Sequence, residues 1–266
     1  MLLSLAAALL AATPLSTAEP STNRPSPERF HLYLLIGQSN MAGRGLVEEQ
    51  DKIPHPRVLM FTKANEWAPA VDPLHFDKRS AAVGLGSTFA RLTADANPEV
   101  TIGLIPAAVS GTPLDRWRKG GDLYEQAVVR AKAALKDGTL KGILWHQGES
   151  DTGDATLART YGARLAGMVR DLRAELGAGD VPFIAGLLGD FVGEAASTDG
   201  ESVWWPQKPI YWSVVNEQIA GLPAEVSHSA VVSASALTAS DGVHFDGPSL
   251  REFGRRYARA LAELDR

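Results

Sequence analysis

The residue types in this chain that could perform chemistry are a serine placed two residues after a glycine and a histidine placed three residues after an aspartate. Ser39 follows Gly37, so a tight turn can project its hydroxyl as a nucleophile. A serine hydroxyl is unreactive at neutral pH without a neighbouring base, and His244 is the candidate base. Asp241 is close enough to hold one imidazole nitrogen and leave the other for Ser39. The three residues predict acyl transfer through a serine.

Such a reaction develops a negative oxygen that fixed hydrogen-bond donors must stabilise. Three donors are candidates, namely the backbone amides of Ser39 and Gly111 and the side-chain amide of Gln147. A glycine at position 111 suits a place where the backbone must approach the substrate closely. We therefore expect these three groups to surround the reacting carbonyl.

The elements that would position these residues are short apolar runs alternating with segments of helical periodicity. Strands buried on both faces of a parallel sheet have such near-continuous apolarity. We predict five strands, with a further one in an insertion near 57–62, and the five lie at 32–36, 100–105, 141–145, 181–188 and 229–233. Helices are predicted near 83–95, 122–136, 157–176, 209–220 and 249–264.

This alternation predicts one α/β domain, a three-layer α/β/α sandwich around a mostly parallel five-stranded sheet. In open parallel sheets, ligands bind outside the carboxyl ends of the strands. The candidate residues follow predicted strands, so we expect them to converge at that edge. The last helix carries an S-x-x-E pattern, which predicts a capping box from Ser249 to Glu252.

The amino-terminal segment predicts export. Residues 1–18 contain an apolar run from Leu2 to Ala12, too short to span a bilayer, and a small-x-small site at Ser16 and Ala18. Residues 19–30 are rich in Pro, Ser and charge, as in a solvated linker. We therefore expect a signal peptide at 1–18, a linker at 19–30, an esterase-type domain at 31–266, and a secreted or periplasmic protein without a membrane anchor after cleavage.

The composition excludes several classes of function. The 266 residues carry a net charge of −5 with no basic block, which disfavours nucleic-acid binding. The chain has no cysteine, which excludes disulfides, thiolate zinc sites and a cysteine nucleophile. A phosphate-binding GxxxxGK[ST] loop is missing, and Gly84-Leu85-Gly86 lacks the third glycine of a dinucleotide fingerprint. We expect no cofactor.

Four blocks of the sequence resemble the SGNH (GDSL-like) hydrolases, in the branch with sialate O-acetylesterases and the acetylxylan esterases of carbohydrate esterase family 6. They are Leu35–Gly45 (LIGQSNMAGRG), Ser110–Gly111 with Arg116–Trp117, Trp145–Asp151 (WHQGESD) and Asp241–Phe245 (DGVHF). The resemblance spans nearly all of residues 31–266 and implies a flavodoxin-like fold and metal-free removal of acetyl groups from carbohydrate hydroxyls.

The resemblance also implies roles for individual residues. Ser39 would be the nucleophile and His244 the base, with Gly111 and Gln147 as oxyanion donors. Gln147 stands where most SGNH enzymes have asparagine, a departure typical of this branch. The acid partner of the histidine is open between Asp241 and Glu149, and proximity in sequence favours Asp241.

Substrate-binding candidates rest on weaker signals. The long segment 191–209 carries Trp204 and Trp205, and aromatic faces suit sugar rings. The pair could equally anchor the segment on the core. Arg116 and Trp117 could line the site, or form a surface cation stacked on an aromatic ring.

Two other functions remain possible at this stage. A metal-dependent hydrolase could use His146, Glu149, Asp241 and His244 as ligands, although this leaves Ser39 without a task. A non-catalytic exported carbohydrate-binding protein could have the same fold, but the presence of all three candidate catalytic residues argues against it. Neither the particular acetylated glycan nor the oligomeric state follows from the sequence.

Overall fold

The computed structural model describes residues 25–197 and 208–266, and within them the strands form one sheet of order β3-β2-β4-β1-β5-β6-β7. Neighbouring strands are parallel except for β3, which pairs antiparallel with β2. The strands are β1 Phe30–Gly37, β2 Val58–Phe61, β3 Trp67–Pro69, β4 Thr101–Pro106, β5 Thr139–His146, β6 Phe183–Gly186 and β7 Ser229–Val232.

The expectation of a five-stranded sheet is wrong, because the described residues form seven strands. The five predicted runs become β1, β4, β5, β6 and β7, and the run near 57–62 becomes β2. The additional strand, β3, has three residues and pairs with β2 through the turn after Phe61. So short a segment contains no alternation or apolar run from which a strand could be predicted.

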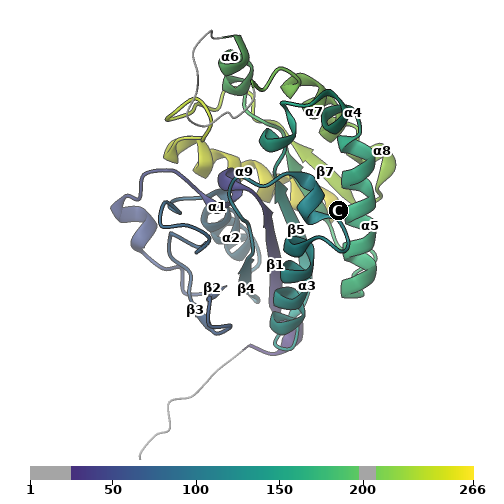
Figure 1. Cartoon of the computed structure of the whole chain (residues 1–266). Helices are drawn as coiled ribbons and strands as arrows, with labels where there is room; N and C mark the ends of the chain where they lie inside the picture. The colour runs from purple at the N-terminus through teal and green to yellow at the C-terminus, as the bar shows by residue number, and fades with distance from the viewer. Residues whose placement is uncertain (1–24, 198–207) are drawn as a thin grey trace, which may run out of the picture.

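The helices cover both faces of the sheet, which gives three layers (Figure 1). α2 and α9 pack against each other on one face, while α3, α5 and α8 lie on the other. The helices are α1 Ser39–Ala42, α2 Leu85–Ala96, α3 Asp122–Ala134, α4 Ala155–Arg159, α5 Tyr161–Leu176, α6 Phe191–Ser197, α7 Trp212–Ala220, α8 Leu222–Glu225 and α9 Gly247–Leu264.

The start of α9 differs from the predicted capping box. The N-cap is Asp246, whose side chain accepts a hydrogen bond from the Ser249 backbone N–H at 2.8 Å. Pro248 lies in the first turn, where its missing N–H costs nothing. The helix therefore begins two residues before Ser249, directly after the segment that carries His244.

The folded part of the chain begins slightly earlier than predicted. Phe30, assigned above to the linker, is the first residue of β1 and is buried. Residues Pro27–Arg29 form a 3₁₀ turn, and the Pro27 carbonyl accepts a hydrogen bond from the Thr139 hydroxyl at 3.0 Å. The predicted signal peptide at 1–18 lies outside the described residues.

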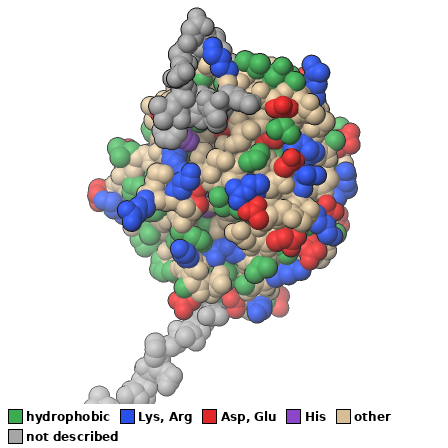
Figure 2. Space-filling view, viewed as in Figure 1, with side chains coloured by type: hydrophobic (Ala, Val, Ile, Leu, Met, Phe, Trp, Pro, Cys, Tyr) green, Lys and Arg blue, Asp and Glu red, His purple; other side chains and the backbone are tan. Residues whose placement is uncertain are grey.

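The surface is mixed in charge. Figure 2 shows Lys and Arg interspersed with Asp and Glu over the face in view. None of the helices in the described ranges is both long enough and apolar enough to cross a membrane.

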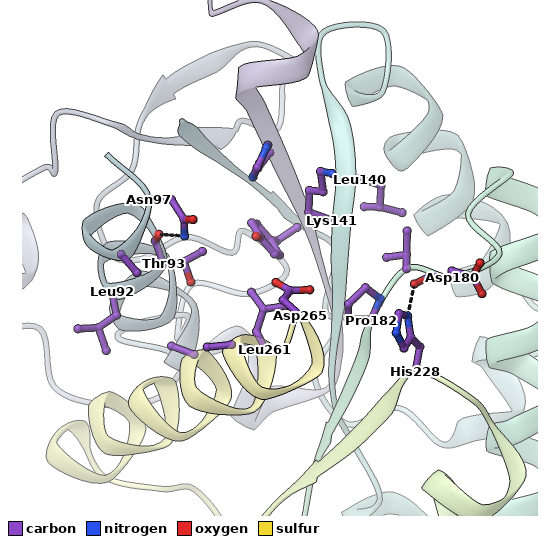
Figure 3. A pocket seen from close by; sticks show the side chains of 16 residues that line it. Leu92, Thr93, Asn97, Leu140, Lys141, Asp180, Pro182, His228, Leu261 and Asp265 are labelled. Carbon is purple, nitrogen blue, oxygen red and sulfur yellow. Dashed lines mark hydrogen bonds between the residues drawn. The ribbon is translucent and has the colours of Figure 1, made fainter. Parts of the chain in front are cut away.

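A cavity of about 450 Å³ lies at the amino ends of the strands, between α2, α9 and the starts of β1 and β5 (Figure 3). Its charged or titratable lining residues are His31, Tyr33, Lys141, Asp180, His228 and Asp265. His228 Nδ1 lies 2.7 Å from the Asp180 carbonyl oxygen, so this histidine is engaged with the backbone. The predicted catalytic residues lie at the opposite edge of the sheet, so this cavity is separate from them.

Candidate active site

The predicted nucleophile lies where β1 ends. Ser39 is the first residue of α1, and the strand reaches it through Gly37 and Gln38. Gly37 has φ +131°, and a Cβ there would lie 2.1 Å from the carbonyl oxygen of His146 on β5. Glycine is therefore required for the chain to turn beside the neighbouring strand and present Ser39 at the carboxyl edge.

His244 joins the other two predicted catalytic residues by hydrogen bonds. Its Nε2 lies 3.1 Å from the Ser39 Oγ, and its Nδ1 lies 2.7 Å from the Asp241 Oδ2. The second carboxylate oxygen, Asp241 Oδ1, accepts from the backbone N–H groups of Val243 and His244 at 3.1 and 2.8 Å. The turn thus orients the carboxylate toward the ring, as a serine–histidine–aspartate series requires.

The local charges keep Asp241 ionised. Partial burial would raise the pKa of Asp241, but hydrogen bonds from the ring and backbone N–H of His244 outweigh this and lower the pKa. The carboxylate is therefore negative at neutral pH, and it favours the Nδ1–H tautomer of His244. That tautomer leaves Nε2 unprotonated and able to accept the Ser39 proton.

Glu149, the alternative acid partner, is directed elsewhere. Its Oε1 accepts from Asn40 Nδ2 at 2.6 Å and lies 3.3 Å from His146 Nε2. The His146 ring packs edge-on between Phe245 and Phe253, with centroid separations of 5.6 and 5.3 Å. His146 is thus a buried structural histidine, and Glu149 pairs with it rather than with the ring of His244.

The backbone at Gly111 is held by a network of side chains. Asp77 Oδ2 accepts from the Ser110 N–H at 2.8 Å and from the Ser110 hydroxyl, and Arg44 donates to the same hydroxyl. Gly111 has φ +71°, the left-handed region that favours glycine. In the described ranges, no backbone acceptor takes a hydrogen bond from the Gly111 or Ser39 amide, so both can donate to a substrate.

Gln147, the third predicted oxyanion donor, has its side-chain amide engaged with other groups of the protein. Its side chain is 0% exposed, and its Nε2 donates to Asp151 Oδ2 at 2.7 Å and to the Thr112 carbonyl at 3.0 Å. Its Oε1 accepts from the Tyr161 hydroxyl at 2.8 Å. Both amide hydrogens therefore have protein acceptors. The contact with Thr112 instead ties the Gln147 side chain to the segment that carries the Gly111 amide.

Of the weaker substrate-binding candidates, Arg116 and Trp117 lie in the described residues, and their surroundings differ. Trp117 is 1% exposed, packs edge-on against Trp145 at 5.6 Å and donates its indole N–H to Thr112 Oγ1, so it has no face for a sugar. Arg116 is half-exposed and forms a two-bond ion pair with Asp122. Trp117 is accordingly a core residue rather than a substrate contact.

Trp204 and Trp205 lie outside the described residues. The start of the long segment 191–209 that carries them is helical as α6.

The four candidate ligands of a metal-dependent hydrolase form two separate hydrogen-bonded pairs. His146 is paired with Glu149, and His244 is paired with Asp241. In the part of the chain that the structure describes, no three His, Asp or Glu side chains are grouped so that they could hold a metal ion.

Two buried polar residues of the site have tasks that the sequence interpretation did not assign. Asn40 contacts Glu149 and the backbone on both sides of His244. Asp151 accepts from Gln147 and from the Leu114 N–H at 3.0 Å. Asn40 lies in the polar block after β1, and Asp151 lies in the polar block after β5. Their position in these blocks is the sequence feature from which a role in the site could have been predicted.

Comparison with known proteins finds carbohydrate esterases. A family model described as "Carbohydrate esterase, sialic acid-specific acetylesterase" matches residues 29–263. A probable carbohydrate esterase of Arabidopsis thaliana is 35% identical over 189 residues, which are 62% of this chain and 71% of that protein.

Solved structures show the same fold. An X-ray structure of a protein from Arabidopsis thaliana superimposes with a TM-score of 0.76 and 29% identity, covering 90% of this chain and 99% of that chain. The crystal structure of NanS superimposes with a TM-score of 0.70 and 17% identity, covering 90% and 98% respectively. The family model covers nearly the whole described domain, and the chain belongs to the carbohydrate esterase family of sialic acid-specific acetylesterases.

Proposed function

We propose that this chain is a secreted carbohydrate O-acetylesterase with Ser39 as nucleophile, His244 as general base and Asp241 as the acid partner of the histidine. The observation that carries the proposal is the hydrogen-bonded series from Ser39 Oγ through His244 to Asp241. Family membership supports the esterase class and a carbohydrate substrate. The serine mechanism, the acetyl group and the export route are what the proposal adds.

The reaction follows from this arrangement in two halves. Ser39 Oγ attacks the acetyl carbonyl carbon while His244 Nε2 takes the hydroxyl proton. The tetrahedral intermediate collapses when the ester bond to the sugar oxygen breaks, and His244 returns the proton to that oxygen. Water then attacks the acetyl-serine with His244 as base, acetate leaves, and Ser39 regains its proton. No metal or cofactor takes part.

The oxyanion is stabilised by the backbone amides of Ser39 and Gly111. Each lost donor of this kind costs about 10²–10³-fold in kcat in serine hydrolases. The Arg44–Ser110–Asp77 network fixes the Gly111 amide before substrate arrives, so no reorganisation is needed during the reaction. Gln147 contributes by holding Thr112 in place.

The substrate class is an acetylated glycan, of the acetylxylan or the acetylated sialic acid type. Acetate release from a matched panel of acetylxylan, O-acetylated sialic acid and other acetylated sugars identifies which one. Acetate release from at least one acetylated glycan of the panel, with none from its deacetylated counterpart, supports the proposal. Binding to these glycans without release of acetate would instead support the non-catalytic carbohydrate-binding alternative. Arg116, Trp204 and Trp205 are the residues we propose for sugar contact.

Export is proposed from residues 1–18, with a mature protein that begins at or near Glu19. Mass spectrometry of the protein from its native host tests this point. A cytoplasmic protein with residues 1–18 intact would contradict export and leave the esterase proposal standing.

A further inference from the structure

The carboxamide of Asn40 is bonded to the backbone on both sides of the general base. Asn40 Nδ2 donates to the Val243 carbonyl at 3.1 Å, and Asn40 Oδ1 accepts from the Phe245 N–H at 3.1 Å. The second hydrogen of Nδ2 goes to Glu149 Oε1 at 2.6 Å. Asn40 is 0% exposed, and both of its donor hydrogens and its acceptor oxygen are engaged.

On its other side, the segment that Asn40 holds is bonded to Asp241 Oδ1 through the Val243 and His244 backbone N–H groups, and the His244 carbonyl accepts from the Ser240 N–H at 2.9 Å. Asp241 and Gly242 are exposed, and a Cβ on Gly242 would have open space around it. The Asp241 side chain, which orients His244 from this side, is itself 31% exposed. On the buried side of the segment, the hydrogen bonds of Asn40 fix the main chain at 243 and 245.

Glu149 anchors Asn40 as a buried carboxylate. Burial would raise the pKa of Glu149, but its charge interaction and hydrogen bond with His146, together with the bond from Asn40, outweigh this and lower the pKa. A charged acceptor makes a stronger hydrogen bond than a neutral one, so Glu149 holds the carboxamide in one orientation. That orientation directs Nδ2 toward the Val243 carbonyl and Oδ1 toward the Phe245 N–H.

From these contacts we infer that Asn40, anchored by Glu149, is a positioning residue that sets the distance between His244 and Ser39. Asn40 follows Ser39 directly in the chain, so one residue links the nucleophile to the main chain of the base. The inference rests on the proposed serine mechanism. It gives Glu149 a role through Asn40, and it gives a function to an asparagine that touches no substrate.

The test compares Asn40→Ala with a matched control, Asn216→Ala. Asn216 also bonds a backbone N–H and carbonyl, both of Leu188, at 2.8 and 3.1 Å. Both variants lose an asparagine that bonds the main chain, fully buried at Asn40 and partly buried at Asn216, so both should lower Tm. A misplacement of a catalytic group by about 1 Å can cost about 10²-fold. We therefore expect Asn40→Ala to lower kcat by about 10²-fold and to leave KM unchanged. Asn216→Ala should lower kcat by less than about threefold.

A second pair of variants keeps the inference testable if Asn40→Ala fails to fold. Asn40→Asp places a carboxylate against Glu149 and removes both donors. The double variant Asn40→Asp/Glu149→Gln restores one donor–acceptor pair with its polarity reversed. We expect the double variant to recover kcat at least about tenfold over Asn40→Asp, because that contact is restored.

The outcomes separate this inference from the proposed function. If Ser39→Ala is inactive while Asn40→Ala loses no more kcat than Asn216→Ala, the positioning role is wrong and the serine mechanism stands. Absence of rescue in the double variant overturns the anchoring of residue 40 by residue 149. If Ser39→Ala remains active, the proposed mechanism itself is wrong.

Discussion

The carboxylate of Asp241 binds His244 at two points, because its Oδ2 lies 2.7 Å from the ring Nδ1 and its Oδ1 accepts the backbone N–H at 2.8 Å. A single side chain thus fixes both the main chain and the tautomer of the proposed base. The geometry therefore supports Asp241 as the proposed acid partner, while Glu149 is bonded to Asn40.

The first prediction compares the two acids. Asp241→Asn should lower kcat by several orders of magnitude, since amide replacement at the equivalent position of a serine protease costs about 10⁴-fold by favouring the wrong tautomer. Glu149→Gln should cost much less, because a carboxamide oxygen can still accept from Asn40. Steady-state acetate release measures both. A larger loss in Glu149→Gln would transfer the acid role to Glu149.

A second prediction concerns Gln147. Because its amide holds Asp151 and Thr112, Gln147→Ala should lower Tm together with kcat. Loss of a buried hydrogen-bonding group that leaves its partners unsatisfied costs about 1–3 kcal/mol each. Calorimetry and acetate release on the same preparation give the two quantities. A fall in kcat of about 10²–10³-fold with Tm unchanged would make Gln147 a direct oxyanion donor after all.

A third prediction concerns pH and stability. Burial raises the pKa of Asp72 to about 7, above the unfolded value of about 3.9. The folded state then holds the proton more tightly than the unfolded state, so this contribution to stability is lost as pH rises from about 4 to 7.

Asp72→Asn is neutral throughout that range and should flatten the dependence. Between about pH 5 and pH 8, the Tm of the parent should fall relative to that of the variant. Thermal unfolding at the two pH values measures this difference. Equal shifts in both proteins would show that Asp72 is ionised in the folded state.

The meeting of the proposed catalytic residues at one edge of the sheet could be predicted from sequence for a physical reason. Parallel strands deliver their following residues to one edge, so Ser39 and His244 were expected there from strand positions alone. The contact between Asp241 and His244 is local, so it could be predicted from their separation of three residues in the sequence. Sequence position does not determine where a side chain points at a strand end, which is why the buried hydrogen bonds of Gln147 and Asn40 could not be predicted.

Short or tertiary features were less predictable. β3 has only Trp67–Pro69 and depends on pairing with β2 rather than on its own pattern. Trp117 resembled a site aromatic because it lies in a block with polar residues, but packing against Trp145 decides its role. The N-cap of α9 is Asp246 and not the predicted Ser249. Both residue types suit an N-cap, and Pro248 fits the first turn of the helix that begins after Asp246.

Acetate release by Ser39→Ala is the most direct measurement of whether Ser39 is the nucleophile of the proposed metal-free acetylesterase. The parent enzyme is assayed beside the variant on the best glycan of the panel, each with and without EDTA, and folding is checked by Tm. Nucleophile deletions cost roughly 10³–10⁶-fold, so we predict a loss of that size with an unchanged fold and no effect of EDTA on the parent. A folded Ser39→Ala protein that retains a tenth of the activity, or parent activity that EDTA abolishes and zinc restores, would contradict the account.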